Sequence, residues 1–94
     1  MSHTGAIDKN YDVLLRCTTI NHNVIDFLKA EAVIDMMQEA ELRTQRNPIK
    51  QLILLFQWLK AVPSDRYESF LQVMKDTEQE HVVANLLRGR TEGI

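Results

Sequence analysis

The sequence predicts an all-α protein, a compact antiparallel bundle of five or six helices. The 94-residue chain is 45% hydrophobic and 26% charged, with only three glycines and two prolines, which is typical of a globular helical domain. Its apolar residues recur at the i, i+3, i+4 spacing of helices, and no segment alternates as a strand does. The breaks between the periodic segments are short, so we expect neighbouring helices to be antiparallel around a single core.

Residues 48–62 are the most apolar segment and are predicted to form the central helix. Asn47 can cap its start, Pro48 suits the first helical position, and Pro63 forces its end. A helix that is apolar nearly all round is normally buried. Two apolar residues, Leu54 and Trp58, fall inside the polar arc of this helix. The broad apolar face carries Ile49, Leu52, Ile53, Leu55, Phe56, Leu59 and Val62.

The chain divides into a lead-in, one domain and a tail. Residues 1–7 carry no periodic pattern and are expected to be a flexible N-terminal lead-in. The helical domain is expected to span residues 8–88, with Asp8 as the cap of its first helix. Gly89 is the expected stop of the last helix, which leaves residues 89–94 as a C-terminal tail.

Between these limits the pattern leaves one boundary open. Residues 24–42 are good helix formers without glycine or proline, and they predict either one long helix or two helices joined near residues 29–32. A third helix is therefore either separate and short or merged with the second. Further along, Ser64 predicts the cap of an amphipathic helix, and Thr77 with Glu80 predicts a capping box for the last one.

Composition and charge argue against several classes of function. The net charge of −2 provides no electrostatic footprint for nucleic acid, and the longest apolar run, residues 52–56, is far short of a membrane span. A single cysteine fits a reducing compartment, so we expect a cytoplasmic protein.

Candidate chemistry is sparse. Cys17 lies on the apolar face of its helix and is expected to be a small buried hydrophobe. His3, His22 and His81 are scattered, and no cysteine or carboxylate lies beside them at metal-ligand spacing. There is no glycine-rich phosphate loop. We therefore expect neither an enzyme nor a bound metal or cofactor.

Charge patterning offers a more specific hypothesis. One interpretation is a solvated helix face followed by a basic turn, which accounts for most such runs. The other is a domain whose acidic face docks on the basic face of another copy, a heterologous contact that can propagate. Leu54 and Trp58 are a candidate apolar anchor on the basic side, or are buried under a neighbouring helix. The acidic face comprises Asp26, Glu31, Asp35, Glu39 and Glu41. The basic face comprises Arg16, Arg43, Arg46 and Lys50.

Three segments resemble caspase recruitment domains (CARDs), nearest in pattern to those of initiator caspases and the apoptosome. Residues 14–17, Leu-Leu-Arg-Cys, resemble their first helix, and residues 50–53, Lys-Gln-Leu-Ile, resemble their fourth. The most specific match is residues 70–87, in which Phe-Leu, Asp-Thr and a final apolar helix follow the fifth and sixth helices of CARDs. The resemblance covers residues 8–88 and is strongest from Trp58 onward.

The resemblance implies a six-helix death fold without catalytic activity. It implies a homotypic module that recruits or clusters CARD-containing signalling proteins in apoptosis or innate immunity. The partner would be another CARD-containing protein (a caspase, adaptor or sensor), with self-association as a further possibility. In this family basic residues of the first and fourth helices contact acids of the second and third. Carried over to this chain, the contact sets Arg16 and Lys50 against Glu31, Asp35 and Glu39.

Other functions remain open at this point. Pyrin and death-effector domains share the six-helix architecture. A stand-alone CARD decoy or inhibitor would cap a partner with only one competent face. An unrelated dimeric helical regulatory domain would bury Leu54 and Trp58 in a two-fold contact.

Overall fold

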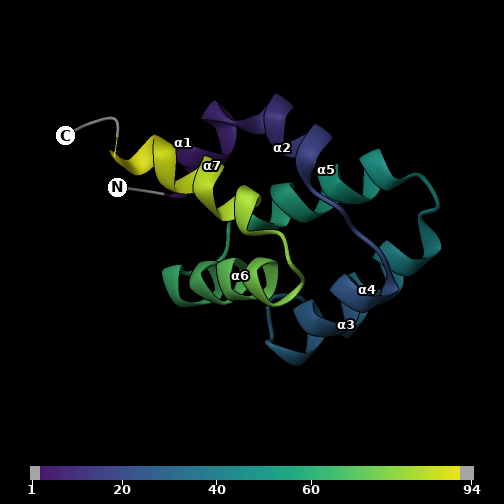
Figure 1. The fold of residues 1–94 in the computed structure, drawn as a ribbon. Helices are drawn as coiled ribbons and strands as arrows, with labels where there is room; N and C mark the ends of the chain where they lie inside the picture. The colour runs from purple at the N-terminus through teal and green to yellow at the C-terminus, as the bar shows by residue number, and fades with distance from the viewer. Residues whose placement is uncertain (1–2, 92–94) are drawn as a thin grey trace.

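The computed structural model of the protein describes the backbone of residues 3–91 and the side chains of residues 4–87. Within this part of the chain there are seven helices and no strands (Figure 1). The radius of gyration, 12.4 Å, is close to the roughly 13 Å of a compact chain of this length. The helices are α1 (His3–Lys9), α2 (Tyr11–Cys17), α3 (His22–Ala30), α4 (Met36–Thr44), α5 (Pro48–Leu59), α6 (Ser64–Asp76) and α7 (Glu80–Thr91).

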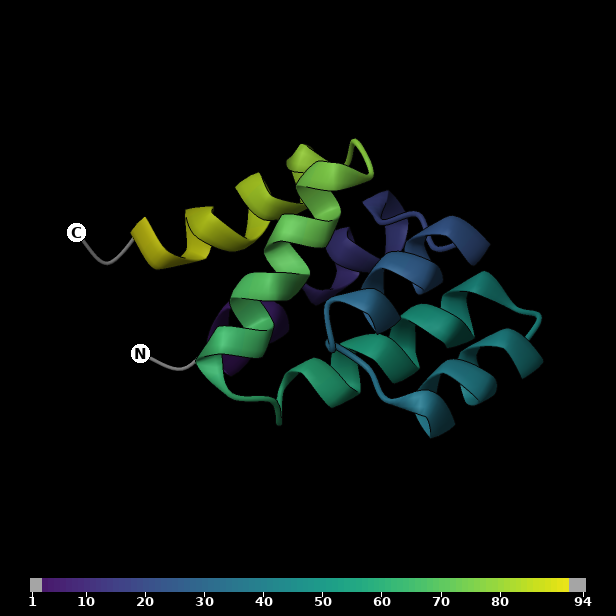
Figure 2. The same cartoon turned by 90° about the horizontal axis from the view of Figure 1, so that it is seen from below.

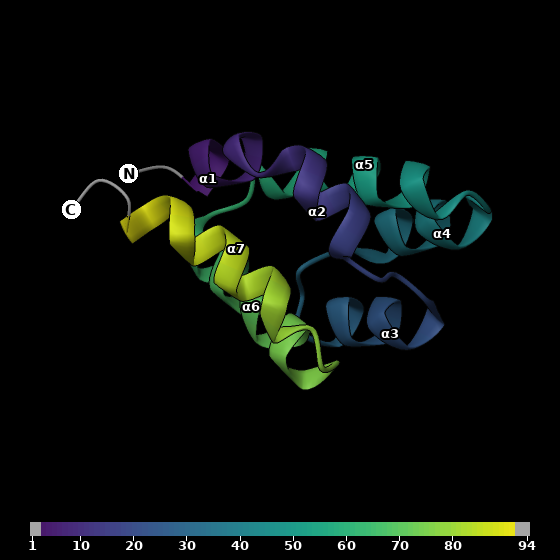
Figure 3. The same cartoon turned by 45° about the horizontal axis from the view of Figure 1, so that its top comes forward.

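The helices pack as neighbours around a continuous core. Helix α7 packs against α1, α2 and α6, and α3 packs against both α4 and α6. Helix α5 runs beside α2 and returns antiparallel to α4, as Figures 2 and 3 show. The prediction of an all-α bundle is confirmed, with seven helices between residues 3 and 91 where five or six were expected.

The prediction that α5 is the central helix is confirmed by its burial. Asn47 caps the helix through its side-chain oxygen, which accepts from the amides of Ile49 and Lys50 at 2.9 and 3.2 Å. Phe56 is fully buried and meets the ring of Phe70 edge to face, with 6.1 Å between centroids. Leu52, Leu55, Phe56 and Leu59 of the predicted apolar face are buried, together with Phe70 and Leu71 of α6 and Leu86 of α7.

The apolar face of α5 is narrower than its sequence predicts. Ile49 and Ile53 are 47% and 37% exposed. Helix α4 lies along the opposite flank, where the Gln51 amide donates to the carbonyl of Leu42 at 2.7 Å and Leu54 is half-buried. The two isoleucines are therefore on a flank of α5 that no helix fully covers.

The N-terminal lead-in is a helix in the structure, contrary to expectation. Helix α1 begins at His3, and Ile7 is completely buried. Asp8 is not a cap, because it lies inside α1 and pairs with Lys60 at 2.5 Å. The Thr4 hydroxyl donates to the carbonyl of Lys60 at 3.0 Å. The burial of Ile7, the packing of α1 against α7 and these two contacts hold α1 in place, although the sequence of α1 has no periodic pattern.

The segment 24–42 contains two helices, which settles the open boundary in favour of a separate third helix. Helix α3 ends in a Schellman motif: the amide of Val33 donates to the carbonyl of Leu28 at 2.9 Å, and that of Ala32 to Lys29 at 3.1 Å. Ala32 adopts the left-handed conformation, with φ of 59°. Asp35 then starts α4 in a capping box with Gln38 that the sequence interpretation did not identify.

The corner between α6 and α7 repeats this motif. The amides of Gln79 and Glu78 donate to the carbonyls of Met74 and Lys75, and Glu78 has φ of 63°. The expected capping box at Thr77 is wrong, because Thr77 ends α6 and its hydroxyl donates back to Val73 at 2.8 Å.

The expected stop at Gly89 is also wrong. Helix α7 continues through this glycine to Thr91. A glycine inside a helix costs only about 1 kcal/mol, so it does not have to end one. Of the expected tail, residues 89–91 are helical, and residues 92–94 lie outside the described part of the chain.

Replacing Leu59 by alanine tests the central position of α5. Leu59 is 1% exposed, so Leu59→Ala should lower the free energy of unfolding by about 2–5 kcal/mol in urea melts. The exposed neighbour Gln57 provides the control, and Gln57→Ala should change stability by less than about 0.5 kcal/mol. A loss below about 1 kcal/mol for Leu59→Ala would place this leucine outside the core.

A second substitution tests the left-handed residue at the α3–α4 corner. Ala32→Gly should raise the free energy of unfolding, by up to about 1 kcal/mol, because glycine adopts positive φ without steric cost. The control is Ala40→Gly in the middle of α4, which should lower the free energy of unfolding by about 0.5–1 kcal/mol. The same sign for both variants in denaturant melts would contradict a strained Ala32.

Candidate interaction surface

The described residues provide no cluster of catalytic or metal-binding groups. No group of three or more His, Cys, Asp or Glu side chains in this part of the chain is placed to hold a metal ion. The half-buried Cys17 accepts a weak contact at its sulfur from the Asn85 amide, at 3.7 Å. The His81 ring contacts the carbonyl of Cys17, not its thiol, at 2.7 Å. These contacts tie α2 to α7, and the candidate site is therefore the charged surface.

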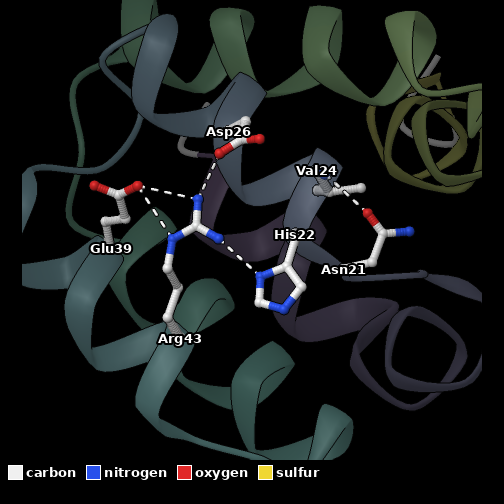
Figure 4. A network of polar contacts seen from close by, with 6 residues as sticks. All are labelled: Asn21, His22, Val24, Asp26, Glu39 and Arg43. Carbon is white, nitrogen blue, oxygen red and sulfur yellow. Dashed lines mark hydrogen bonds and ion pairs between the residues drawn. The ribbon is translucent and has the colours of Figure 1, made fainter.

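Arg43 is the centre of a polar network that joins α3 to α4 (Figure 4). One guanidinium nitrogen, Nη2, donates to Asp26 at 2.5 Å and to Glu39 at 3.0 Å, and Nε donates to Glu39 at 3.2 Å. The third nitrogen, Nη1, lies 2.8 Å from Nδ1 of His22. Because guanidinium nitrogens only donate, Nδ1 must be the acceptor in this contact.

These contacts change the charge of the surface that the sequence predicts. The hydrogen bonds that Arg43 donates to Glu39 raise the pKa of Arg43 above its ordinary value, with a smaller contribution from Asp26, although burial acts against both. The guanidinium therefore stays charged at physiological pH. Arg43 belongs to the same cluster as two of the predicted acids, and it is not part of a separate basic face.

The other three predicted basic residues are exposed. Arg16 lies in the last turn of α2, Arg46 in the loop before α5, and Lys50 in the first turn of α5. None of the three has an internal ion pair with another described residue. We call them the basic edge. Arg46 and Lys50 are four residues apart at the start of α5, and Arg16 lies on α2, a helix that packs against α5.

The remaining three predicted acids lie at the N-terminal end of α4 or within this helix. Glu31 and Asp35 occupy the α3–α4 corner, and Glu41 lies on α4; all three are exposed and without an internal ion pair in the described part of the chain. We call them the acidic surface. Nine helical residues span about 13 Å, which separates the corner from the loop that carries Arg46 (Figure 2).

The apolar residues near these charges differ from the predicted anchor. Leu54 and Trp58 are half-buried and pack against the core. Leu54 faces α4, where it lines an open groove of about 440 Å³ with Ala40, Glu41, Thr44 and Gln45. Leu54 of the predicted anchor therefore lies on the flank of α5 that faces α4, one helical turn after Lys50.

Six large apolar residues in the described part of the chain are exposed, and sequence reasoning missed the four of them that lie on α4 and α5. Met36 and Met37, 73% and 81% exposed, follow the acidic corner, and Ile49 and Ile53 flank Lys50 on the basic side. The two isoleucines could have been suspected, because Ile53 lies at the edge of the apolar arc of α5 beside its polar residues. The methionines gave no signal, since they fit the apolar stripe of a buried helix.

Comparison of the chain with known protein families, with curated proteins and with solved structures finds no match. None of the helices in the described part of the chain is long and apolar enough to cross a membrane. The function is therefore inferred from the surface and from the sequence segments that resemble CARDs.

Removing the Arg43 guanidinium tests the network. Arg43→Met keeps most of the aliphatic stem and removes the contacts to Asp26 and Glu39, which leaves two neighbouring carboxylates without their cation. The melting temperature should fall at low salt, and the fall should shrink as salt screens the carboxylates. Arg46→Met, at an exposed position without an ion pair, is the control and should leave the melting temperature unchanged. Equal melting temperatures for the two variants would contradict the network.

Proposed function

We propose that the chain is a homotypic protein–protein interaction module of the CARD type, which recruits or clusters CARD-containing proteins in apoptotic or innate immune signalling. The observation that carries the proposal is the segregation of unpaired charge on the surface. The acidic surface and the basic edge each present three exposed charges without internal ion pairs to other described residues.

The distance between the two charged sets supports docking between chains. The α3–α4 corner and the α4–α5 loop are about 13 Å apart along α4. This exceeds the screening length of about 8 Å at physiological salt, so one chain does not neutralise its own corner with its own loop. A second chain can bring a basic edge directly against an acidic surface.

The fold also supports the proposal. Only Asn10 separates α1 from α2, so the two count as one bent helix in a six-helix arrangement. The distinct helix α4 supplies a third helix of nine residues, where the sequence alone left it merged or short. When α1 and α2 are counted as one helix, α5 is the fourth helix. The contact that the CARD resemblance implies would then set Arg16 of the first helix and Lys50 of the fourth against acids of the second and third helices.

The small free energy of exposed ion pairs limits the affinity that these charges can provide. A solvent-exposed ion pair contributes about 0.2–1 kcal/mol, so three such pairs alone give a weak contact. Their main effect is on the choice of partner and on the rate of encounter. Because the two surfaces are different, the contact is heterologous, and repeated contacts produce a ring or an open helical assembly.

Charge reversal with complementation tests the proposal. The acidic surface is reversed by Glu31→Lys with Glu41→Lys, and the basic edge by Arg16→Glu with Lys50→Glu. Asp35 and Glu39 are left unchanged, because the first caps α4 and the second holds Arg43. Light scattering should show that each double variant fails to associate alone and that mixing the two restores association, since opposite charges again face each other.

The controls are Asp65→Lys and Arg66→Glu, two exposed positions on α6 away from both surfaces. They should associate like the unmodified chain. A decoy, which has only one competent face, would lose partner binding after reversal of one surface and not of the other. Four indistinguishable traces for the unmodified chain, the two double variants and their mixture would overturn the proposal.

Salt provides an independent prediction for the same contact. Raising the ionic strength from about 0.1 M to about 1 M shortens the screening length from about 10 Å to about 3 Å. The dissociation constant measured by sedimentation should rise about tenfold, which corresponds to the loss of two or three exposed pairs. A dissociation constant that does not change would make apolar burial the main source of affinity.

A further inference from the structure

Helix α5 carries two apolar features on different flanks. The first, the α5 ridge, consists of Ile49 and Ile53, which are 47% and 37% exposed. The second, the α4–α5 groove, is the open hollow of about 440 Å³ between the two helices, lined by Ala40, Glu41, Thr44, Gln45 and Leu54. Each feature lies beside one residue of the charge contact described above: Glu41 of the acidic surface lines the groove, and Lys50 of the basic edge lies next to the ridge.

The two isoleucines of the α5 ridge have the spacing of apolar side chains that a helix inserts into a groove. Ile49 and Ile53 are four residues apart and so lie one above the other on the helix, as the anchors of amphipathic helices do when they bind grooves. Lys50 is exposed between them in the sequence, and Arg46 lies in the loop that precedes the helix. The ridge is thus a pair of aliphatic side chains bordered by positive charge.

The groove is complementary to such an anchor. Its apolar lining is Leu54, which packs on the core, and Ala40. The Thr44 hydroxyl donates to the carbonyl of Ala40 at 2.8 Å, and the Gln45 side-chain oxygen accepts from the amide of Asn47 at 3.2 Å. Glu41 is the lining residue that keeps an exposed charge without an ion pair in the described part of the chain. The groove therefore suits an aliphatic side chain with a cation beside it.

We propose that the occupant of the α4–α5 groove is the α5 ridge of a second copy of the chain, with Lys50 or Arg46 of that copy beside Glu41. The inference rests on the proposed function and supplies the apolar part of its contact. Charge complementarity selects this pairing. A two-fold contact of groove with groove would bring Glu41 against the same residue of the other copy, and ridge with ridge would bring Lys50 against Lys50.

The placement of the two features makes the contact directional. Neighbouring residues of a helix point about 100° apart, so Ile53 and Leu54 face different sides of α5. One copy cannot place its ridge in its own groove, and each copy that donates a ridge still has a groove to fill. The contact is therefore heterologous and extends from copy to copy. Its apolar area is small, so the assembly should be concentration-dependent.

The test uses one variant for each feature. Ala40→Trp fills the groove and leaves the ridge intact, and Ile49→Ser with Ile53→Ser removes the ridge and leaves the groove intact. Ala84→Trp, an exposed alanine on α7, adds the same bulk elsewhere, and Leu87→Ser removes an equally exposed apolar residue, at 38%. Circular-dichroism melts check the fold of all four, and sedimentation velocity up to about 1 mM measures association.

The expected result is that each feature variant is monomeric alone, that the two together form a heterodimer that does not extend, and that both controls assemble like the unmodified chain. Loss of association in the groove variant alone would indicate groove-to-groove contact and overturn the inference. Loss in the ridge variant alone would indicate ridge-to-ridge contact and also overturn it.

The remaining outcomes separate this inference from the proposed function. If neither feature variant changes association while charge reversal abolishes it, the apolar contact is wrong and the charge contact stands. If the unmodified chain stays monomeric at about 1 mM, a second copy is not the occupant, and the charge contact is then judged by reversal against a CARD-containing partner.

Discussion

The burial of α5 is the constraint on which the rest of the structure depends. Four of its residues, Leu52, Leu55, Phe56 and Leu59, are at most 2% exposed, so the helix cannot rotate about its axis without exposing one of them. Because this buried face is fixed, the directions of the other side chains of α5 are fixed as well. Leu54 must face α4, and Lys50 with the isoleucines beside it must face solvent. The same packing that holds the fold together thus decides which side chains of α5 are available to a partner.

The Arg43 network acts on the other half of the surface. It holds α3 against α4 through two carboxylates and one imidazole, and it removes Asp26 and Glu39 from the set of unpaired acids. Of the charges left over, Glu31 and Asp35 lie at the N-terminal end of α4, Glu41 lies in its second half, and Arg46 and Lys50 lie beyond its C-terminus. Negative charge at the N-terminal end of α4 also suits the helix dipole. Local helix electrostatics therefore favour acids at the α3–α4 corner.

Sequence reasoning succeeded where local chemistry decides the outcome. Asn47 and Pro48 define the start of α5, and helical spacing identifies its buried face, because both signals act within one or two turns. It failed where the deciding contact is distant or the usual residue is missing. Ala32 and Glu78 adopt the left-handed conformation of Schellman motifs, a position at which glycine is usual. Helix α1 is held by contacts to Lys60, which is distant in the sequence. Arg43 pairs with Asp26, which is 17 residues away. No local sequence pattern indicates these contacts.

The central claim is that one chain's basic edge docks on another chain's acidic surface, and mapping a single such contact by NMR tests it most directly. The isotope-labelled chain carries Arg16→Ser, Arg46→Ser and Lys50→Ser, so that only its acidic surface can bind. The unlabelled chain carries Glu31→Gln and Glu41→Gln, so that only its basic edge can bind. The account predicts amide shift changes confined to the α3–α4 corner and α4 of the labelled chain. Changes centred on α6 or α7, or no changes at about 1 mM, would contradict it.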